Sequence, residues 1–198
     1  MGVSLSKNQS VSLSKEAGSA LAMVALGVGW DVAKGGGGGF LSSVFGGGGG
    51  GSIGLDASAI MFDANRKVVD KVSFMQLNSR DGSVRHSGDN LTGEGDGDDE
   101  TINIDLTRLP GQVEHIVLTV NSFRGQTFDK VANAYGRVID LDTGKELAKY
   151  NISDSGAHTG IILASLSRSG GDWTFRALGE RAGGRTVEDL VGPSANLI

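Results

Sequence analysis

An acidic, glycine-rich segment runs directly into a segment of alternating apolar and polar residues in the stretch Asp89-Asn90-Leu91-Thr92-Gly93-Glu94-Gly95-Asp96-Gly97-Asp98-Asp99-Glu100-Thr101-Ile102-Asn103-Ile104-Asp105. From residue 101 onward, apolar residues occupy every second position, which is the period of a strand buried on one face. Runs of the same period, separated by glycine-containing turns, recur along most of the chain. The sequence therefore predicts an all-β protein, an antiparallel β-sandwich with short helical turns.

The other strands are located from the same alternation or from short apolar runs bounded by turn residues. They are expected over residues 3–7, 11–15, 21–30, 53–63, 67–74, 113–120, 134–139, 146–152, 159–166 and 173–178. The first two runs predict either a hairpin or two edge strands that contribute to the same core. One helical turn is expected at 128–131, and a short helix capped by a Thr is expected at 186–191.

Length and composition indicate one domain over residues 1–198. The chain has no cysteine, which excludes disulfides and thiolate metal sites. Residues 1–7 have no apolar core of signal-peptide length, and no segment reaches the length of a membrane span, so a soluble intracellular protein is expected. Residues 35–51 are expected to form a flexible polyglycine loop insertion around an apolar island at 40–45. That island either rests on the protein surface or tethers a partner or a membrane surface.

Seven of the 23 acidic residues lie between residues 89 and 105, and no Lys or Arg interrupts them. Without them, 16 acids would face 18 bases, and the net charge of −5 would become +2. Like charges repel by about 1 kcal/mol per close pair even in water, so a hard cation would stabilise such a segment. Ca²⁺ takes carboxylate, amide and carbonyl oxygens in flexible geometry, and the glycines let the main chain bring them together. The sequence predicts a calcium site.

The predicted ligands are the oxygen-bearing residues of this stretch and the acidic residues that end or begin neighbouring strands. The first set is Asp89, Asn90, Glu94, Asp98 and Glu100, and the second set is Asp31, Asp56, Asp96 and Asp99. The spacing is not that of an EF-hand, because Glu94 stands where the invariant Gly of that loop would be and strands flank the stretch. The alternative interpretation is a solvated anionic loop without an ion.

Other functional classes have weaker support. Clustered carboxylates can hold Mg²⁺ for phosphoester hydrolysis, but no P-loop, nucleophile elbow or neighbouring base accompanies them. A structural binding module that needs no ion is a further alternative. Nucleic-acid binding is disfavoured because the conspicuous charge is negative. Trp30 and Trp173 follow the strand pattern and are expected in the core, and the scattered histidines do not favour a zinc site.

Several motifs together resemble the TerD family of tellurium-resistance and stress-response proteins. They are Gly27-Val28-Gly29-Trp30-Asp31, Leu55-Asp56-Ala57-Ser58-Ala59, the acidic stretch with His86-Ser87-Gly88 before it, and Gly171-Asp172-Trp173-Thr174-Phe175-Arg176-Ala177. The resemblance implies a β-sandwich with long calcium-binding loops and no enzymatic activity. It also implies a location in the cytoplasm or at the inner face of the membrane. The expected partners are other tellurium-resistance proteins, a membrane-associated complex, or the protein itself.

One departure from the family pattern concerns the number of ions. Relatives carry further aspartates before the Leu-Asp-Ala-Ser motif, whereas this chain has Ser52 and Gly54. The resemblance therefore leaves open whether the chain binds one calcium ion or more.

Overall fold

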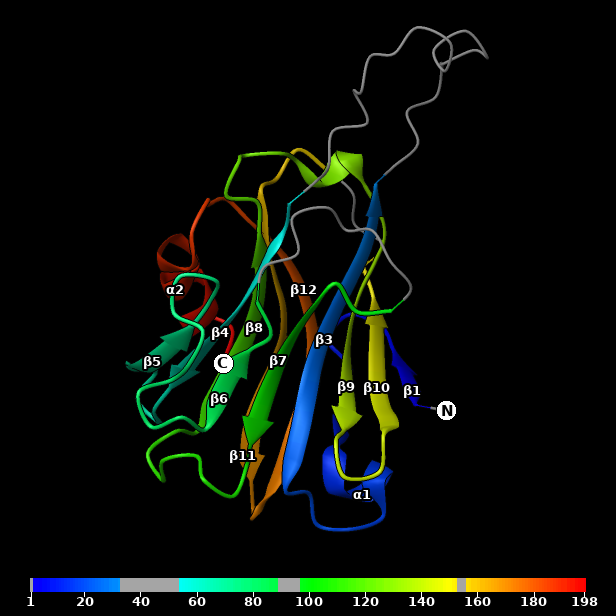
Figure 1. The fold of residues 1–198 in the computed structure, drawn as a ribbon, viewed down its shortest axis with the longest axis vertical. Helices are drawn as coiled ribbons and strands as arrows, with labels where there is room; N and C mark the ends of the chain where they lie inside the picture. The colour runs from blue at the N-terminus through cyan, green and yellow to red at the C-terminus, as the bar shows by residue number, and fades with distance from the viewer. Residues whose placement is uncertain (1, 33–53, 89–96, 153–155) are drawn as a thin grey trace, which may run out of the picture.

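The computed structural model describes residues 2–32, 54–88, 97–152 and 156–198. Within these ranges the strands form two six-stranded sheets packed face to face (Figure 1). The first sheet has the order β1 (Val3–Leu5), β10 (Lys145–Asn151), β9 (Val131–Asp140), β3 (Met23–Val32), β7 (Glu100–Asp105) and β6 (Val84–His86). The second has the order β2 (Ser10–Ser12), β12 (Asp172–Ala182), β11 (Gly160–Ser169), β8 (His115–Asn121), β4 (Asp56–Phe62) and β5 (Val68–Val72). The predicted β-sandwich is confirmed, and every pairing is antiparallel except that of β1 with β10.

The alternation of apolar and polar residues that follows the carboxylates determines how β7 packs. Its residues alternate between buried and partly exposed, and Glu100, Ile102 and Ile104 point into the sandwich. Both tryptophans are buried as predicted, Trp30 at 3% and Trp173 at 6% exposure. Apolar side chains of both sheets form one continuous core between them, so the hydrophobic effect holds the two layers together.

A second, smaller core lies on the outer face of the β4–β8–β11 sheet. Helix α2 (Val187–Ala195) covers this face and inserts the fully buried Leu190 among apolar side chains of the sheet. As predicted, Thr186 is the residue before the helix, and its backbone N–H donates to the Asp189 carboxylate at 3.0 Å. The predicted turn near residue 128 is the 3₁₀ helix η1 (Phe128–Lys130).

Two local predictions are wrong. The strand expected over 11–15 ends at Ser12, and helix α1 (Leu13–Ala17) follows, because the Ser12 hydroxyl accepts from the Lys15 N–H at 3.3 Å and caps the helix. Gly18, with φ of 80°, ends it. The polar segment between β5 and β7 contains the short strand β6, which was not predicted.

The first two strands are edge strands rather than a hairpin. β1 pairs with β10 in one sheet and β2 pairs with β12 in the other, which is the second of the two predicted arrangements. None of the helices in the described ranges is long and apolar enough to cross a membrane. The polyglycine insertion predicted at 35–51 lies outside the described residues.

One end of the sandwich carries the segments singled out by the sequence. β3 and β10 end there, β4, β7 and β9 begin there, and η1 lies over it (Figure 1). Residues that are far apart in the sequence therefore meet at this end, while helix α1 lies at the opposite end.

Candidate metal centre

The carboxylates of Asp98, Asp99 and Glu100 lie where β7 begins beside the last residues of β3. The Asp99 N–H donates to the Val28 carbonyl at 2.8 Å, and the Asp99 Oδ2 accepts from the Trp30 N–H at 2.7 Å. Asp99 thus continues the pairing of β7 with β3 through its backbone and its side chain. The end of the acidic stretch is fixed to the Gly-Val-Gly-Trp-Asp motif, from which it is separated by about seventy residues.

Asp98 lies flat against the backbone of β3 because residue 27 has no side chain. A Cβ at Gly27 would lie only 2.1 Å from Asp98 Oδ2 and 2.4 Å from its Cγ. In this position the Asp98 Oδ1 accepts from the Arg137 Nε at 2.8 Å and lies 3.0 Å from the Tyr135 hydroxyl. The missing side chain of Gly27 therefore leaves the space that the Asp98 carboxylate occupies.

Gly29 likewise leaves the space that the aromatic ring of Tyr135 occupies. It lies two residues along the same strand, on the same face, and a Cβ there would approach the Tyr135 ring to 2.5 Å. The Tyr135 hydroxyl also lies 2.7 Å from the Gly97 carbonyl, to which it can donate. Burial, and then the charge of Asp98, raise the pKa of this hydroxyl, so it remains a donor at neutral pH. The ring holds the backbone just before Asp98 in place.

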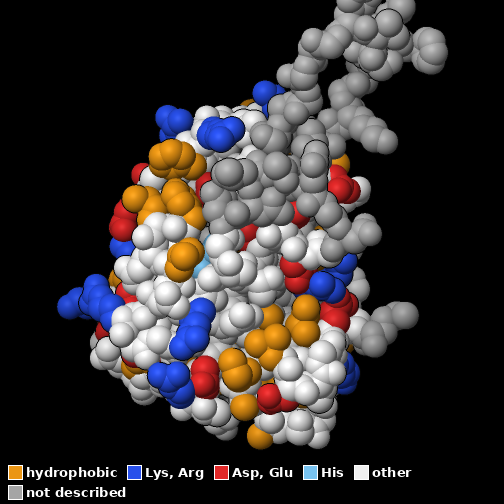
Figure 2. All heavy atoms as spheres, in the orientation of Figure 1, with side chains coloured by type: hydrophobic (Ala, Val, Ile, Leu, Met, Phe, Trp, Pro, Cys, Tyr) orange, Lys and Arg blue, Asp and Glu red, His pale blue; other side chains and the backbone are white. Residues whose placement is uncertain are grey.

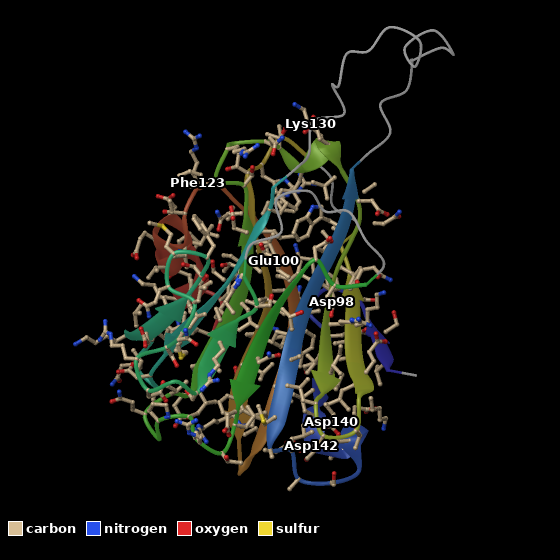
Figure 3. The ribbon with its side chains drawn as sticks, viewed as in Figure 1. Asp98, Glu100, Phe123, Lys130, Asp140 and Asp142 are labelled. Atoms are coloured by element: carbon tan, nitrogen blue, oxygen red, sulfur yellow. The ribbon has the colours of Figure 1, made fainter. Side chains whose placement is uncertain are left out.

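Glu100 points inward and connects the two sheets. Its side chain is fully buried, and its Oε2 accepts from the Ala57 N–H of β4 at 2.6 Å and lies 3.3 Å from His86 Nε2 (Figure 3). The His86 Nδ1 accepts from the Gly88 N–H at 3.0 Å, so a neutral ring carries its proton on Nε2, facing the Ala57 carbonyl at 3.0 Å and Glu100. This arrangement fixes the start of β7 against β4.

The two remaining predicted acids in the described part of the chain approach the same end from different strands. Asp31, at the end of β3, is exposed and accepts from the Asn133 side-chain amide at 2.7 Å. Asp56, at the start of β4, is buried, and its Oδ2 accepts from the Phe123 N–H at 3.2 Å. Asp31 is therefore held by β9, with its charge acting on Asp99, whereas Asp56 holds the turn after β8.

Like charges at this end affect one another. Burial raises the pKa of Asp99, the charges of Asp31, Glu100 and Asp98 raise it further, and the hydrogen bond from the Trp30 N–H opposes them only in part. Asp98 forms an ion pair with Arg137. The end of β3 and the start of β7 therefore carry negative charge that a bound cation would neutralise.

The donor chemistry fits a hard cation such as Ca²⁺, since the groups are carboxylates beside a glycine-rich main chain. Among the described residues, however, no three His, Cys, Asp or Glu side chains are close enough to hold a metal ion by themselves. The predicted ligands Asp89, Asn90, Glu94 and Asp96 lie outside the described residues. A calcium site at this position needs oxygens from that segment in addition to those that the structure places.

Sequence reasoning missed the groups that hold the carboxylates, namely Tyr135, Arg137, His86 and Asn133. One signal could have found the first two. Gly27 and Gly29 are spaced by two in a buried strand, so both leave the same face of the sheet without side chains. Such a gap predicts that side chains from elsewhere occupy that face. His86 was visible in the sequence only as part of the motif before the acidic stretch, and nothing in the sequence pattern pointed to Asn133.

Comparisons with known proteins agree in both sequence and fold. The sequence model of one protein family, the TerD domain, matches residues 1–191. The chain is 54% identical to the tellurium resistance protein TerZ of Serratia marcescens, over 95% of this chain and 94% of that protein. It is 42% identical to the stress response protein SCP2 of Bacillus subtilis, over 96% of this chain and 98% of the relative. The fold is similar, with a TM-score of 0.66 and 22% identity, to the crystal structure of a homologue of the telluride resistance protein TerD from Streptomyces coelicolor; the match covers 87% of this chain and 96% of that one.

Proposed function

The chain belongs to the TerD family, and from this premise we propose that it is a calcium-dependent interaction protein in tellurium resistance and the response to chemical stress. The observation that carries the proposal is the accumulation of negative charge at one end of the sandwich. Asp31, Asp98 and Asp99 lie there where β3 ends and β7 begins, and burial, followed by the charges of Asp31, Glu100 and Asp98, raises the pKa of Asp99.

In this proposal the described carboxylates have two roles. Asp31, Asp98 and Asp99 would hold the ion together with the predicted ligands Asp89, Asn90, Glu94 and Asp96. Glu100 and Asp56 are better suited to position the site. The Glu100 carboxylate already contacts Ala57 and His86, and the Asp56 carboxylate accepts a hydrogen bond from the Phe123 turn. Bound Ca²⁺ would supply charge neutralisation, with no part in bond making or breaking.

Calcium binding is tested by thermal unfolding in Ca²⁺ and in chelator. An ion that binds only the folded state at about 100 times its Kd adds about 2.7 kcal/mol to the free energy of unfolding. For a chain of this size, that raises Tm by about 5–10 °C. Asp31→Asn and Asp99→Asn should each reduce the shift. Asp142→Asn is the matched control, because Asp142 is exposed at the opposite end of the sandwich (Figure 3) and the charge change is the same.

The same measurements decide between the proposal and its alternatives. Equal Tm values in Ca²⁺ and chelator, with no heat in a calorimetric titration, would leave the ion-independent binding module as the better account. Hydrolysis of a generic phosphoester in Mg²⁺ or Mn²⁺ that is abolished by Asp98→Ala would favour the metal-dependent hydrolase instead.

An exposed apolar surface lies next to Asp56. The turn after β8 exposes Phe123 at 50%, and its ring packs edge to face on Phe74 with 5.8 Å between centroids. Phe74 and Met75 form the two-residue loop between Ser73 and Gln76, where polar residues are usual, and Met75 is 74% exposed. Hydrophobic side chains gather at this side of the surface, with Lys and Arg side chains beside them (Figure 2). Apolar groups on exposed turns favour binding to another protein.

We propose that other tellurium-resistance proteins bind this surface. Because the Asp56 carboxylate accepts from the Phe123 N–H, the position of the Phe123 turn is connected to the acidic end of the sandwich. Binding of purified tellurium-resistance proteins should be tighter in Ca²⁺ than in chelator, and Phe123→Ser should weaken it. Leu141→Ser is the control, because Leu141 is 40% exposed but lies beside Asp142 at the opposite end. Equal loss of binding in both variants would exclude the Phe123 surface.

A further inference from the structure

An open pocket of 570 Å³ lies where β3 and β10 end and β9 begins, beside the candidate metal centre. Its polar lining comes from Asp31, Asn133, Tyr135, Lys149 and Asn151, which belong to β3, β9 and β10. A volume of about 300–1,000 Å³ is typical of sites for small molecules, whereas a single ion needs far less. The size and the polar lining indicate a small, hydrophilic organic ligand.

The cation among the described residues that line this pocket is Lys149. Its ammonium lies 3.8 Å from the centroid of the Tyr135 ring, and Arg137 is its direct neighbour on β9. Two carboxylates, Asp98 and Glu146, both pair with Arg137, at 2.8 and 3.2 Å. No ion pair joins Lys149 to a carboxylate within the described ranges. Because both of these carboxylates bond to Arg137, an anion beside Lys149 would supply a charged partner that the described residues do not.

The pocket also offers neutral hydrogen-bond donors and a fixed shape. Asn133 has a left-handed backbone with φ of 51°, which is sparsely populated for residues other than glycine. Its amide donates to Asp31, and this contact fixes one wall of the pocket. Asn151 is exposed at the end of β10 and presents a second amide to the same space. An ammonium and a side-chain amide are the groups that hold phosphate or carboxylate oxygens in proteins.

We propose that this pocket binds a small organic anion whose phosphate or carboxylate group pairs with Lys149. Asp31 lines the pocket, and Asp98 lies next to it, so both repel such a ligand. Calcium at the neighbouring carboxylates would cancel this repulsion. The anion should therefore bind more tightly in Ca²⁺, and this second part of the inference rests on the proposed function.

The experiment uses the full-length protein and pairs of probes that differ in charge. AMP is compared with adenosine, ribose 5-phosphate with ribose, and citrate serves as the carboxylate, while the amide resonances of β9 and β10 are followed by NMR in Ca²⁺ and in chelator. The anionic member of each pair should shift the resonances of the pocket residues, and the neutral member should not. Phosphates acting alone, or citrate alone, would identify which oxyanion the pocket accepts.

Variants assign the effect to Lys149. Lys149→Met should weaken binding by about tenfold, as expected for the loss of one charge-assisted contact of about 1.4 kcal/mol, and Lys149→Arg should retain most of the affinity. Lys67→Met is the matched control, because Lys67 is exposed in the turn between β4 and β5 of the other sheet.

Several results would overturn the inference. They are the absence of shifts with all anions at about 10 mM, shifts that map to another surface, or affinity that Lys149→Met leaves unchanged. Calorimetric Ca²⁺ titration and the anion titration, both on the wild-type protein, separate the two proposals. Ca²⁺ binding that persists while the anion fails to bind would refute only the pocket, whereas absent Ca²⁺ binding with intact anion binding would refute only the calcium site.

Discussion

Replacing Gly27 with Ala tests whether the two most distinctive motifs form one unit. The new Cβ would lie 2.1–2.7 Å from the Cγ, Oδ1 and Oδ2 atoms of Asp98, so the carboxylate would have to leave its place. It would then lose the 2.8 Å bond from Arg137 and the contact with the Tyr135 hydroxyl. A hydrogen bond to a charged group contributes about 1.5–3 kcal/mol, and replacing a strand glycine returns about 0.5–1 kcal/mol. We expect Gly27→Ala to lower the free energy of unfolding by about 1–2 kcal/mol.

The second arm of the experiment removes the atoms that cause the clash. In an Asp98→Ala background those three atoms are absent, so Gly27→Ala should be neutral or stabilise by up to about 1 kcal/mol. Urea unfolding of the four proteins gives the coupling energy of the pair, expected near 2 kcal/mol. Gly136→Ala is the control, because its Cβ would meet Leu163 in the core and should cost the same in both backgrounds. A coupling energy below about 0.5 kcal/mol for Gly27 and Asp98 would refute the reasoning.

Two further predictions concern the rest of the fold. Burial raises the pKa of Asp172, but hydrogen bonds from Ser12 and Ser14 outweigh it and lower the pKa below 3.8. The stability that the ionised Asp172 contributes is fully present above the unfolded-state pKa of 3.8 and is lost as pH falls through the lower folded-state pKa. Acid should therefore destabilise Asp172→Asn less steeply than the wild type in urea titrations from pH 7 to 2.5. Parallel profiles would contradict this. Leu190→Ala should lower the free energy of unfolding by about 2–5 kcal/mol, because this side chain of α2 is fully buried against the second sheet. Val191→Ala, at a partly buried position of the same helix, should lower it clearly less in the same assay.

The alternation of apolar and polar residues predicted the fold because each sheet buries one face against the other. The strand positions and the C-terminal helix follow from local patterns that tertiary structure reinforces. The helix at 13–17 was missed because its pattern, Leu-Ser-Lys-Glu-Ala, is too short for a helical period to appear, and only the Ser12 cap and Gly18 mark its ends. Strand β6 was missed because it is three residues long and is formed by pairing with β7.

The candidate site was predictable in its acids but not in their partners. A run of carboxylates is visible in the sequence, and the family resemblance, confirmed by the TerD domain match, adds the expected ion. The sequence does not say which carboxylate is already paired within the protein. Arg137 and Tyr135 lie on β9 and reach Asp98 only because strand order places β9 beside β3. Calcium ligation remains a prediction for all nine residues.

The structure changes how the acidic stretch is understood, because its end is built into both sheets. Asp98 and Asp99 are held by β3 and β9, while Glu100 crosses to Ala57 on β4. A cation that drew the carboxylates toward itself would therefore act on three strands at once. The Ala57 position is adjacent to Asp56, whose carboxylate holds the Phe123 turn. The start of β7 is thus connected to the exposed apolar turn at Phe123 by a short covalent and hydrogen-bonded route, and the proposed function assigns the effect of calcium on partner binding to this route.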